Sequence, residues 1–177
     1  MPFTAFHCAP VWLIFLARPK RFDWIALSVG ATLPDILEPL MIFIFYRHYG
    51  EVRVWTHSLL GAATIVLIGA LLVSVFVVPR ILAYLRDKYK DKRFHTFAKI
   101  DILEHRGSIL VIIYSALIGT ISHVTLDLFY HASNPIFHPY GSTAILFFDD
   151  LMISKIITTI VTGGIFCYLA YRFWWKT

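Results

Sequence analysis

The sequence predicts an all-α integral membrane protein, and two observations support this fold class. Of the 177 residues, 58% are hydrophobic and only 15% are charged, and the mean hydropathy is +0.70. Soluble domains carry about 25% charged residues, so the composition excludes an ordinary soluble domain. Several apolar runs also reach the length of about 20 residues that a membrane-spanning helix needs. We therefore expect residues 1–177 to form a single transmembrane helical domain with four to five membrane helices.

The apolar runs locate these helices along the chain. The long runs are Trp24 to Tyr46, Ser58 to Pro79, Gly107 to Leu126 and Leu151 to Tyr171. A shorter run over 9–17 could form a short or re-entrant helix. The first long run is interrupted by the segment LPDILEP, which places Asp35 and Glu38 between two prolines. Because proline disrupts a helix, we expect a break there, and we interpret Glu38 as mainly structural.

The positions of lysine and arginine predict how the chain lies in the membrane. The net charge is +5, but the basic residues are concentrated in loops, so the charge indicates topology and we expect no nucleic-acid partner. By the positive-inside rule, the N-terminus and segments 47–57 and 131–150 face the exterior of the cell membrane. Segments 18–23 and 80–106 and the C-terminus are then cytoplasmic. We expect no cleavable signal peptide, because the first basic residues follow the first apolar run instead of preceding it.

Histidine and aspartate residues recur at the predicted outer ends of the apolar runs. They are His7, Asp35, His57, His123, Asp127 and His131. Ionisable residues at membrane depth are costly and usually mark a functional site. Residues four apart share a helix face, so His123 and Asp127 can bind one metal ion, and Asp127 and His131 can bind another one turn further out. Imidazole with carboxylate suits zinc first and manganese or iron next, so we expect one or two divalent ions.

Each of these residues also has a structural explanation. His123 and Asp127 could form hydrogen bonds between helices. Asp35 could cap a helix that is broken at the adjacent proline. His57 could lie at the solvated end of a helix with Thr56 as its N-cap. The convergence of five or six ligand-type side chains at one depth nevertheless favours a metal site.

Four segments in order resemble the membrane-bound metal-dependent hydrolases, a family of prokaryotic inner-membrane proteins. These segments are MPFTAFH, VGATLPD, RVWTHSLLG and GTISHVTLDLFYH. The chain departs from the family pattern at Val52, where the family often has histidine, and at Tyr130, where it often has threonine. The resemblance implies metal ligands at His7, Asp35, His57, His123 and Asp127, with His131 as a sixth. The order of the ligands is also similar to that of zinc-dependent phospholipase C, which implies a phosphoester substrate.

These observations favour a metal-dependent hydrolase with an outward-facing site, and a lipid phosphoester is the expected substrate. Asp35 or Asp127 would orient or deprotonate the attacking water. The alternative is a non-catalytic accessory subunit of a larger membrane complex, with a structural or vestigial metal site. A metal transporter is disfavoured because the inner half of the membrane region carries few ligands. The expected partners are membrane lipid and either other membrane proteins or further copies of the chain.

Overall fold

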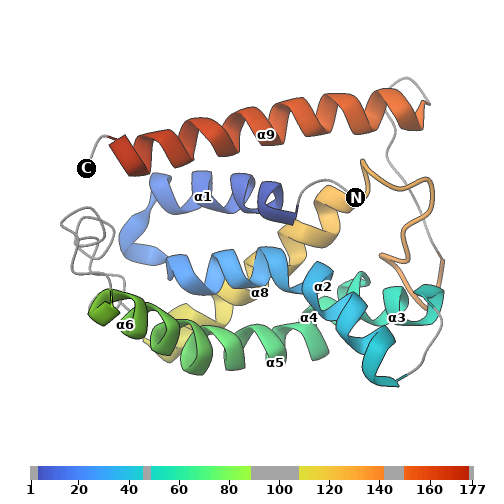
Figure 1. Ribbon diagram of the computed structural model, residues 1–177. Helices are drawn as coiled ribbons and strands as arrows, with labels where there is room; N and C mark the ends of the chain where they lie inside the picture. The colour runs from blue at the N-terminus through green and yellow to red at the C-terminus, as the bar shows by residue number, and fades with distance from the viewer. Residues whose placement is uncertain (1–3, 46–48, 89–107, 142–149, 176–177) are drawn as a thin grey trace.

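The computed structural model describes residues 4–45, 49–88, 108–141 and 150–175. Within these ranges the chain forms helices and no β-strand, so the predicted all-α class is confirmed. The elements are η1 Thr4–His7, α1 Cys8–Ala17, η2 Pro19–Arg21, α2 Trp24–Phe45, α3 Tyr49–Thr56, α4 Leu59–Ala63, α5 Ile65–Leu72, η3 Val73–Val77, α6 Val78–Lys88, α8 Ile109–Asp127 and α9 Leu151–Trp175 (Figure 1).

Four segments are long and apolar enough to cross a membrane. They are Trp24–Ile44, Leu59–Leu85, Ile109–Asp127 and Leu151–Arg172. The segment Thr4–Ala17 is apolar but shorter than these, as the sequence predicted. Large hydrophobic side chains are exposed along the long segments, including Phe43, which is 76% exposed, and Ile160, which is 68% exposed. Such surfaces are suited to contact with lipid, which supports a polytopic membrane protein.

Helix α2 runs without a break through Pro34 and Pro39. The expected break at this segment is therefore wrong, and so is the structural alternative in which Asp35 caps a helix broken at Pro34. Proline is tolerated inside membrane helices because neighbouring groups satisfy the freed backbone atoms. Asp23 caps this helix instead, since its Oδ1 accepts a hydrogen bond of 2.7 Å from the backbone N–H of Ala26.

Helices α2 and α8 pack closely through glycine. A Cβ atom on Gly119 would lie 2.5 Å from the carbonyl oxygen of Leu27. A Cβ atom on Gly30 would overlap the carbonyl oxygen of Ala116 in the same way. Small residues allow membrane helices to approach to this distance. The close approach places the middle of α2 against the second half of α8, where the predicted site residues lie.

The third membrane segment has an irregular start. Ser58 is the N-cap of α4, because its hydroxyl accepts a hydrogen bond of 3.0 Å from the N–H of Gly61. The segment then continues as α5, the π-helical turn η3 and α6. The preceding segment, predicted to be an outer loop, contains the short helix α3. This helix carries Arg53 toward the other helices, where its side chain is 8% exposed.

The two ends of the bundle differ in charge. In Figure 1, η2 and the last turn of α9 lie at the left, with Lys20, Arg21 and Arg172. Helix α3 and the start of α9 lie at the right. Lys20, Arg21 and Arg172 thus lie at one end, as is typical of a cytoplasmic face. At the other end, Arg53 of α3 is buried and pairs with Asp127, and Lys155 lies one turn into α9. Which end faces the cytoplasm stays a prediction.

Candidate metal centre

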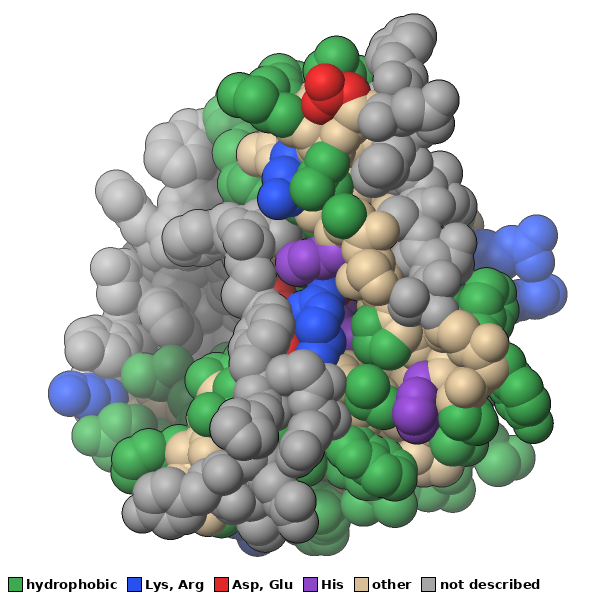
Figure 2. All heavy atoms as spheres, turned by 90° about the vertical axis from the view of Figure 1, so that its right-hand side faces the viewer, with side chains coloured by type: hydrophobic (Ala, Val, Ile, Leu, Met, Phe, Trp, Pro, Cys, Tyr) green, Lys and Arg blue, Asp and Glu red, His purple; other side chains and the backbone are tan. Residues whose placement is uncertain are grey.

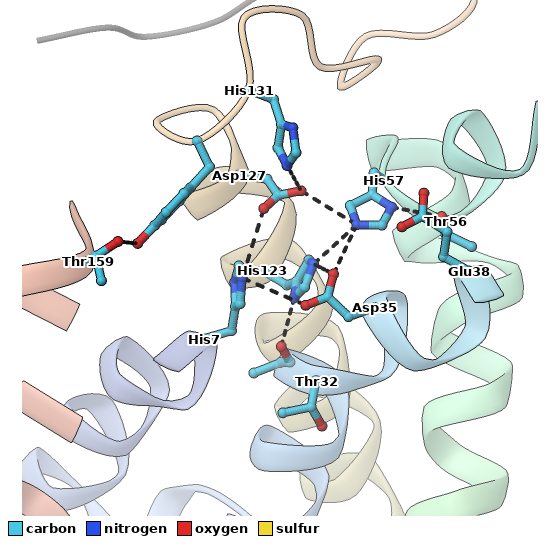
Figure 3. Close-up of polar contacts among 12 residues, drawn as sticks. His7, Thr32, Asp35, Glu38, Thr56, His57, His123, Asp127, His131 and Thr159 are labelled. Carbon is cyan, nitrogen blue, oxygen red and sulfur yellow. Dashed lines mark hydrogen bonds and ion pairs between the residues drawn. The ribbon is translucent and has the colours of Figure 1, made fainter. Parts of the chain in front are cut away.

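The six predicted ligand residues meet at one place in the fold (Figure 3). They are His7 from η1, Asp35 from α2, His57 from the α3–α4 junction, His123 and Asp127 from α8, and His131 from the turn that follows α8. All but His131 are buried. Figure 2 looks onto this end of the bundle and shows histidine, basic and acidic side chains gathered at one point of its face. Segments that are distant in the sequence thus converge on a single polar cluster.

Three acceptor atoms form a nearly equilateral triangle at the centre of the cluster. The Nε2 atoms of His57 and His123 are 3.4 Å apart. Oδ1 of Asp35 lies 3.5 Å from each of them. A tetrahedral zinc ion with bonds of about 2.1 Å has ligand atoms about 3.4 Å apart. The triangle therefore matches one face of a zinc coordination tetrahedron.

A backbone carbonyl fixes the proton of His123. Its Nδ1 lies 2.7 Å from the carbonyl oxygen of Ala31 in α2. A carbonyl oxygen can only accept, so Nδ1–H donates and Nε2 keeps its lone pair. Ring orientation by such a hydrogen bond is typical of metal-binding histidine. The Nε2 lone pair of His123 is thus directed toward the triangle.

The hydroxyl group of Thr56 contacts Nδ1 of His57. Oγ1 of Thr56 donates its hydrogen to the carbonyl oxygen of Val52, at 3.2 Å. The same oxygen lies 2.7 Å from Nδ1 of His57, so we infer that it accepts the Nδ1–H of the ring. His57 is 0% exposed, and Thr56 is not an N-cap. The explanation of His57 as the solvated end of a capped helix is therefore wrong.

These two hydrogen bonds decide what the centre can bind. With Nδ1 as the donor in both rings, the Nε2 atoms of His57 and His123 are acceptors, as is the carboxylate of Asp35. Acceptors that face one another in a buried site repel unless a cation or a proton lies between them. The donor set of imidazole and carboxylate fits a divalent transition metal.

Asp127 extends the centre toward α3. Its Oδ2 lies 3.4 Å from Nε2 of His57 and accepts a hydrogen bond of 2.7 Å from Arg53 Nη2. His57, His123 and Asp127 each offer a ligand atom within 4.8 Å of the others. His123 and Asp127 both form hydrogen bonds to other helices, as their structural explanation expects, yet each also presents an acceptor to the centre.

His7 of η1 lies beside both aspartates of the cluster. Its Nε2 lies 3.9 Å from Asp35 Oδ2 and 3.9 Å from Asp127 Oδ1. Its ring stacks on that of His123, with 4.0 Å between centroids. Neither ring nitrogen has a hydrogen-bond partner in the part of the chain that the structure describes. Burial lowers the pKa of His7 to about 3, so the ring is neutral near pH 7 and can bind a metal ion.

His131 lies at the rim. Its Nε2 is 3.8 Å from Asp127 Oδ2, and its side chain is 24% exposed. Burial lowers its pKa to about 4, so this ring is also neutral near pH 7. His131 is absent from the three groups of possible ligands found among the described residues. Its role as a sixth ligand stays a prediction.

Two further residues belong to the cluster and were not predicted to do so. Glu38 is 1% exposed and offers a ligand atom within 4.8 Å of those of Asp35 and His57. Arg53 is 7% exposed and pairs with Asp127. The sequence does contain a signal for each, because Glu38 follows Asp35 by three residues and Arg53 precedes His57 by four. Both spacings place side chains on one face of a continuous helix.

Comparison with known proteins gives one match. The family described as a domain of unknown function (DUF4184) matches residues 1–176. The chain therefore belongs to this family. No curated protein and no solved structure matches the chain.

Proposed function

We propose that this member of the DUF4184 family is a membrane-embedded metal-dependent hydrolase that acts on a lipid phosphoester. The triangle of acceptor atoms on His57, His123 and Asp35 is the observation that supports this proposal most. Each histidine is oriented by a separate hydrogen bond, so the arrangement does not depend on a single contact. The resemblance to membrane-bound metal-dependent hydrolases agrees with the same residues.

The ligand assignment follows from the distances. His57 and His123 would hold the first ion together with Asp35 or Asp127. His7 faces the second oxygen of each aspartate and would complete this ion or hold a second one. The metal is zinc or another divalent transition metal. When bound, it would supply Lewis acidity that activates a water molecule and polarises the phosphoryl group. Whichever of Asp35 and Asp127 does not bind the ion would orient that water or accept its proton.

The position of Arg53 favours an anionic substrate. Its guanidinium group lies 2.7 Å from Asp127, beside the acceptor triangle. Guanidinium is well suited to bind phosphate oxygens and to stabilise the charge that develops on them. Polar side chains of the cluster also reach the face of the bundle that Figure 2 shows, and we propose that this face lies near the lipid headgroups. A phospholipid could therefore reach the centre with its phosphoester while its acyl chains stay in the bilayer. We propose that this face points to the exterior.

One observation favours the alternative, a non-catalytic accessory subunit of a larger membrane complex. His57 and His123 are both 0% exposed, and enough ligand atoms surround them to close a tetrahedral site. A structural zinc ion has four protein ligands, whereas a catalytic one keeps a position open for water. The two functions therefore differ in whether the bound metal is accessible to an exogenous ligand.

The test is hydrolysis by purified protein in detergent. We expect metal-loaded protein to hydrolyse a short-chain phospholipid, and chelation to abolish the activity until metal is returned. Asp127→Asn should lose both metal and activity, because it removes a carboxylate that offsets the charge of the cation. Metal content without hydrolysis of phospholipid or bis(4-nitrophenyl) phosphate would favour the accessory-subunit function. Protein without metal would contradict both the hydrolase and a structural metal site.

A further inference from the structure

Glu38 is a buried carboxylate of helix α2. It lies on α2 one turn beyond Asp35, and in Figure 3 its side chain lies on the side of His57. It is 1% exposed. Neither carboxylate oxygen has a hydrogen-bond partner within the described ranges. Burying a carboxylate is costly unless another group compensates its charge. A purely structural role leaves this cost unexplained.

Arg53 does not fully compensate the charge of Glu38. Nη1 of Arg53 lies 3.6 Å from Oε1 of Glu38, which exceeds the length of a hydrogen bond. The short contact of Arg53, at 2.7 Å, goes to Asp127. The arginine therefore stands between two carboxylates and is closer to one of them.

The charges of the described residues around the centre favour a bound cation. Among the described residues of the centre, Asp35, Glu38 and Asp127 carry three negative charges when ionised, and Arg53 supplies one positive charge. The two uncompensated charges equal those of one divalent cation. In a buried site, this balance favours a single ion over two ions unless an anion is also bound.

The geometry points to Glu38 as a further ligand of that cation. Glu38, Asp35 and His57 offer ligand atoms that all lie within 4.8 Å of one another. Asp35 belongs both to this group and to the triangle of His57, His123 and Asp35. Glu38 lies one helical turn from Asp35, so its carboxylate can approach the ion that the triangle would hold. We propose that one divalent cation is bound per chain and that α2 provides two of its ligands, Asp35 and Glu38. This inference rests on the metal centre of the proposed function and extends its ligand set.

The experiment uses cobalt(II) as a probe, because its visible absorption reports the number and type of ligands. We expect purified protein, stripped of metal and kept in anion-free buffer, to bind one cobalt ion per chain. Glu38→Gln keeps the shape but removes the charge, and it should weaken binding about 10-fold or more. Glu38→Asp keeps the charge but withdraws the carboxylate, and it should change the visible spectrum of the bound cobalt. A residue that acts only through its charge would leave that spectrum unchanged.

Asp23→Asn is the matched control. Asp23 is a carboxylate of similar burial, 3% exposed, and it caps the far end of α2. Asparagine also caps helices well, so this variant should bind cobalt with the affinity and spectrum of the wild type. Wild-type affinity and spectrum in both Glu38 variants would overturn the inference, as would two cobalt ions per wild-type chain. Intact cobalt binding without phosphoester hydrolysis would instead contradict only the proposed hydrolase function.

Discussion

Nε2 of His57 and Nε2 of His123 face each other at 3.4 Å, although the two residues lie 66 positions apart in the sequence. Both rings are oriented through Nδ1, one by the hydroxyl of Thr56 and the other by the carbonyl of Ala31. In each ring, a hydrogen bond at Nδ1 directs the lone pair of Nε2 toward the other histidine. This arrangement makes the cluster a candidate metal centre. It also shows where the centre can be weakened without removing a ligand.

The first prediction concerns Thr56. Thr56→Val keeps the shape of the side chain but removes the acceptor of the Nδ1–H of His57. The ring then has no partner to fix its orientation, so we expect metal affinity to fall about 10-fold to 100-fold while the fold is retained. The measurement is a competition titration with a metal-binding dye.

Thr125→Val is the control for this substitution. Thr125 is exposed on α8 and its hydroxyl bonds to the carbonyl of Ile121, at 2.8 Å. We expect this variant to bind metal as the wild type does. Equal affinities in all three proteins would mean that Thr56 does not orient His57, and that the inferred tautomer is wrong.

The second prediction joins metal binding to helix docking. His57 and His123 belong to different helical segments, so an ion that binds both also stabilises the packed fold. Saturation at about 100 times the dissociation constant adds about 2.7 kcal/mol. For a chain of this size, we expect chelation to lower the wild-type melting temperature by about 5–10 °C. His57→Ala should melt lower at the start and respond much less to chelator.

His138→Ala provides the comparison, because His138 is exposed beyond the end of α8. Its melting curves should match those of the wild type with and without chelator. If His57→Ala shows the full chelator shift of metal-loaded wild type, His57 is not a ligand.

The helices and part of the site followed from the sequence because the membrane restricts what the backbone can do. Long apolar runs must satisfy their own hydrogen bonds in lipid, so their length and composition suffice to predict spanning helices. The spacing of His123 and Asp127 is likewise a local property of one helix. Both features appear in the structure where the sequence placed them.

Glu38 and Arg53 were missed for a physical reason. Proline usually disrupts a soluble helix, and an irregular segment between Pro34 and Pro39 would not hold the side chains of Asp35 and Glu38 one helical turn apart. The structure keeps α2 continuous, so the two carboxylates lie one turn apart on the same side. The contact between Arg53 and Asp127 joins residues 74 positions apart and depends on how α3 and α8 each pack against α2. No local pattern contains that information.

The third prediction concerns orientation. Tyr140 is 94% exposed in the segment that follows α8, the helix that ends at Asp127 of the metal centre. Lys20 lies in η2, which precedes α2 at the other end of the bundle. In a Cys167→Ser background, we expect Tyr140→Cys in intact cells to react with an impermeant thiol reagent. Lys20→Cys should react only after the membrane is opened. The reverse pattern would place the centre on the cytoplasmic side.

The fourth prediction tests whether the approach of α2 and α8 builds the centre. A Cβ atom on Gly119 would lie 2.5 Å from the carbonyl oxygen of Leu27, so Gly119→Ala must push the two helices apart. We expect a loss of about 1–3 kcal/mol in stability. The same displacement would move Ala31 of α2 away from His123 of α8 and lengthen their hydrogen bond of 2.7 Å. Metal affinity should therefore fall together with the melting temperature.

Gly164→Ala separates this effect from the general effect of alanine in a helix. Gly164 lies inside α9, and a Cβ atom there would meet nothing within 4 Å. Alanine is a better helix former than glycine by about 1 kcal/mol, so this variant should melt at or above the wild-type temperature with unchanged metal affinity. If Gly119→Ala melts lower than the wild type but binds metal with the same affinity, the centre does not depend on the spacing of α2 and α8. His123 would then have to be oriented by a group other than the Ala31 carbonyl.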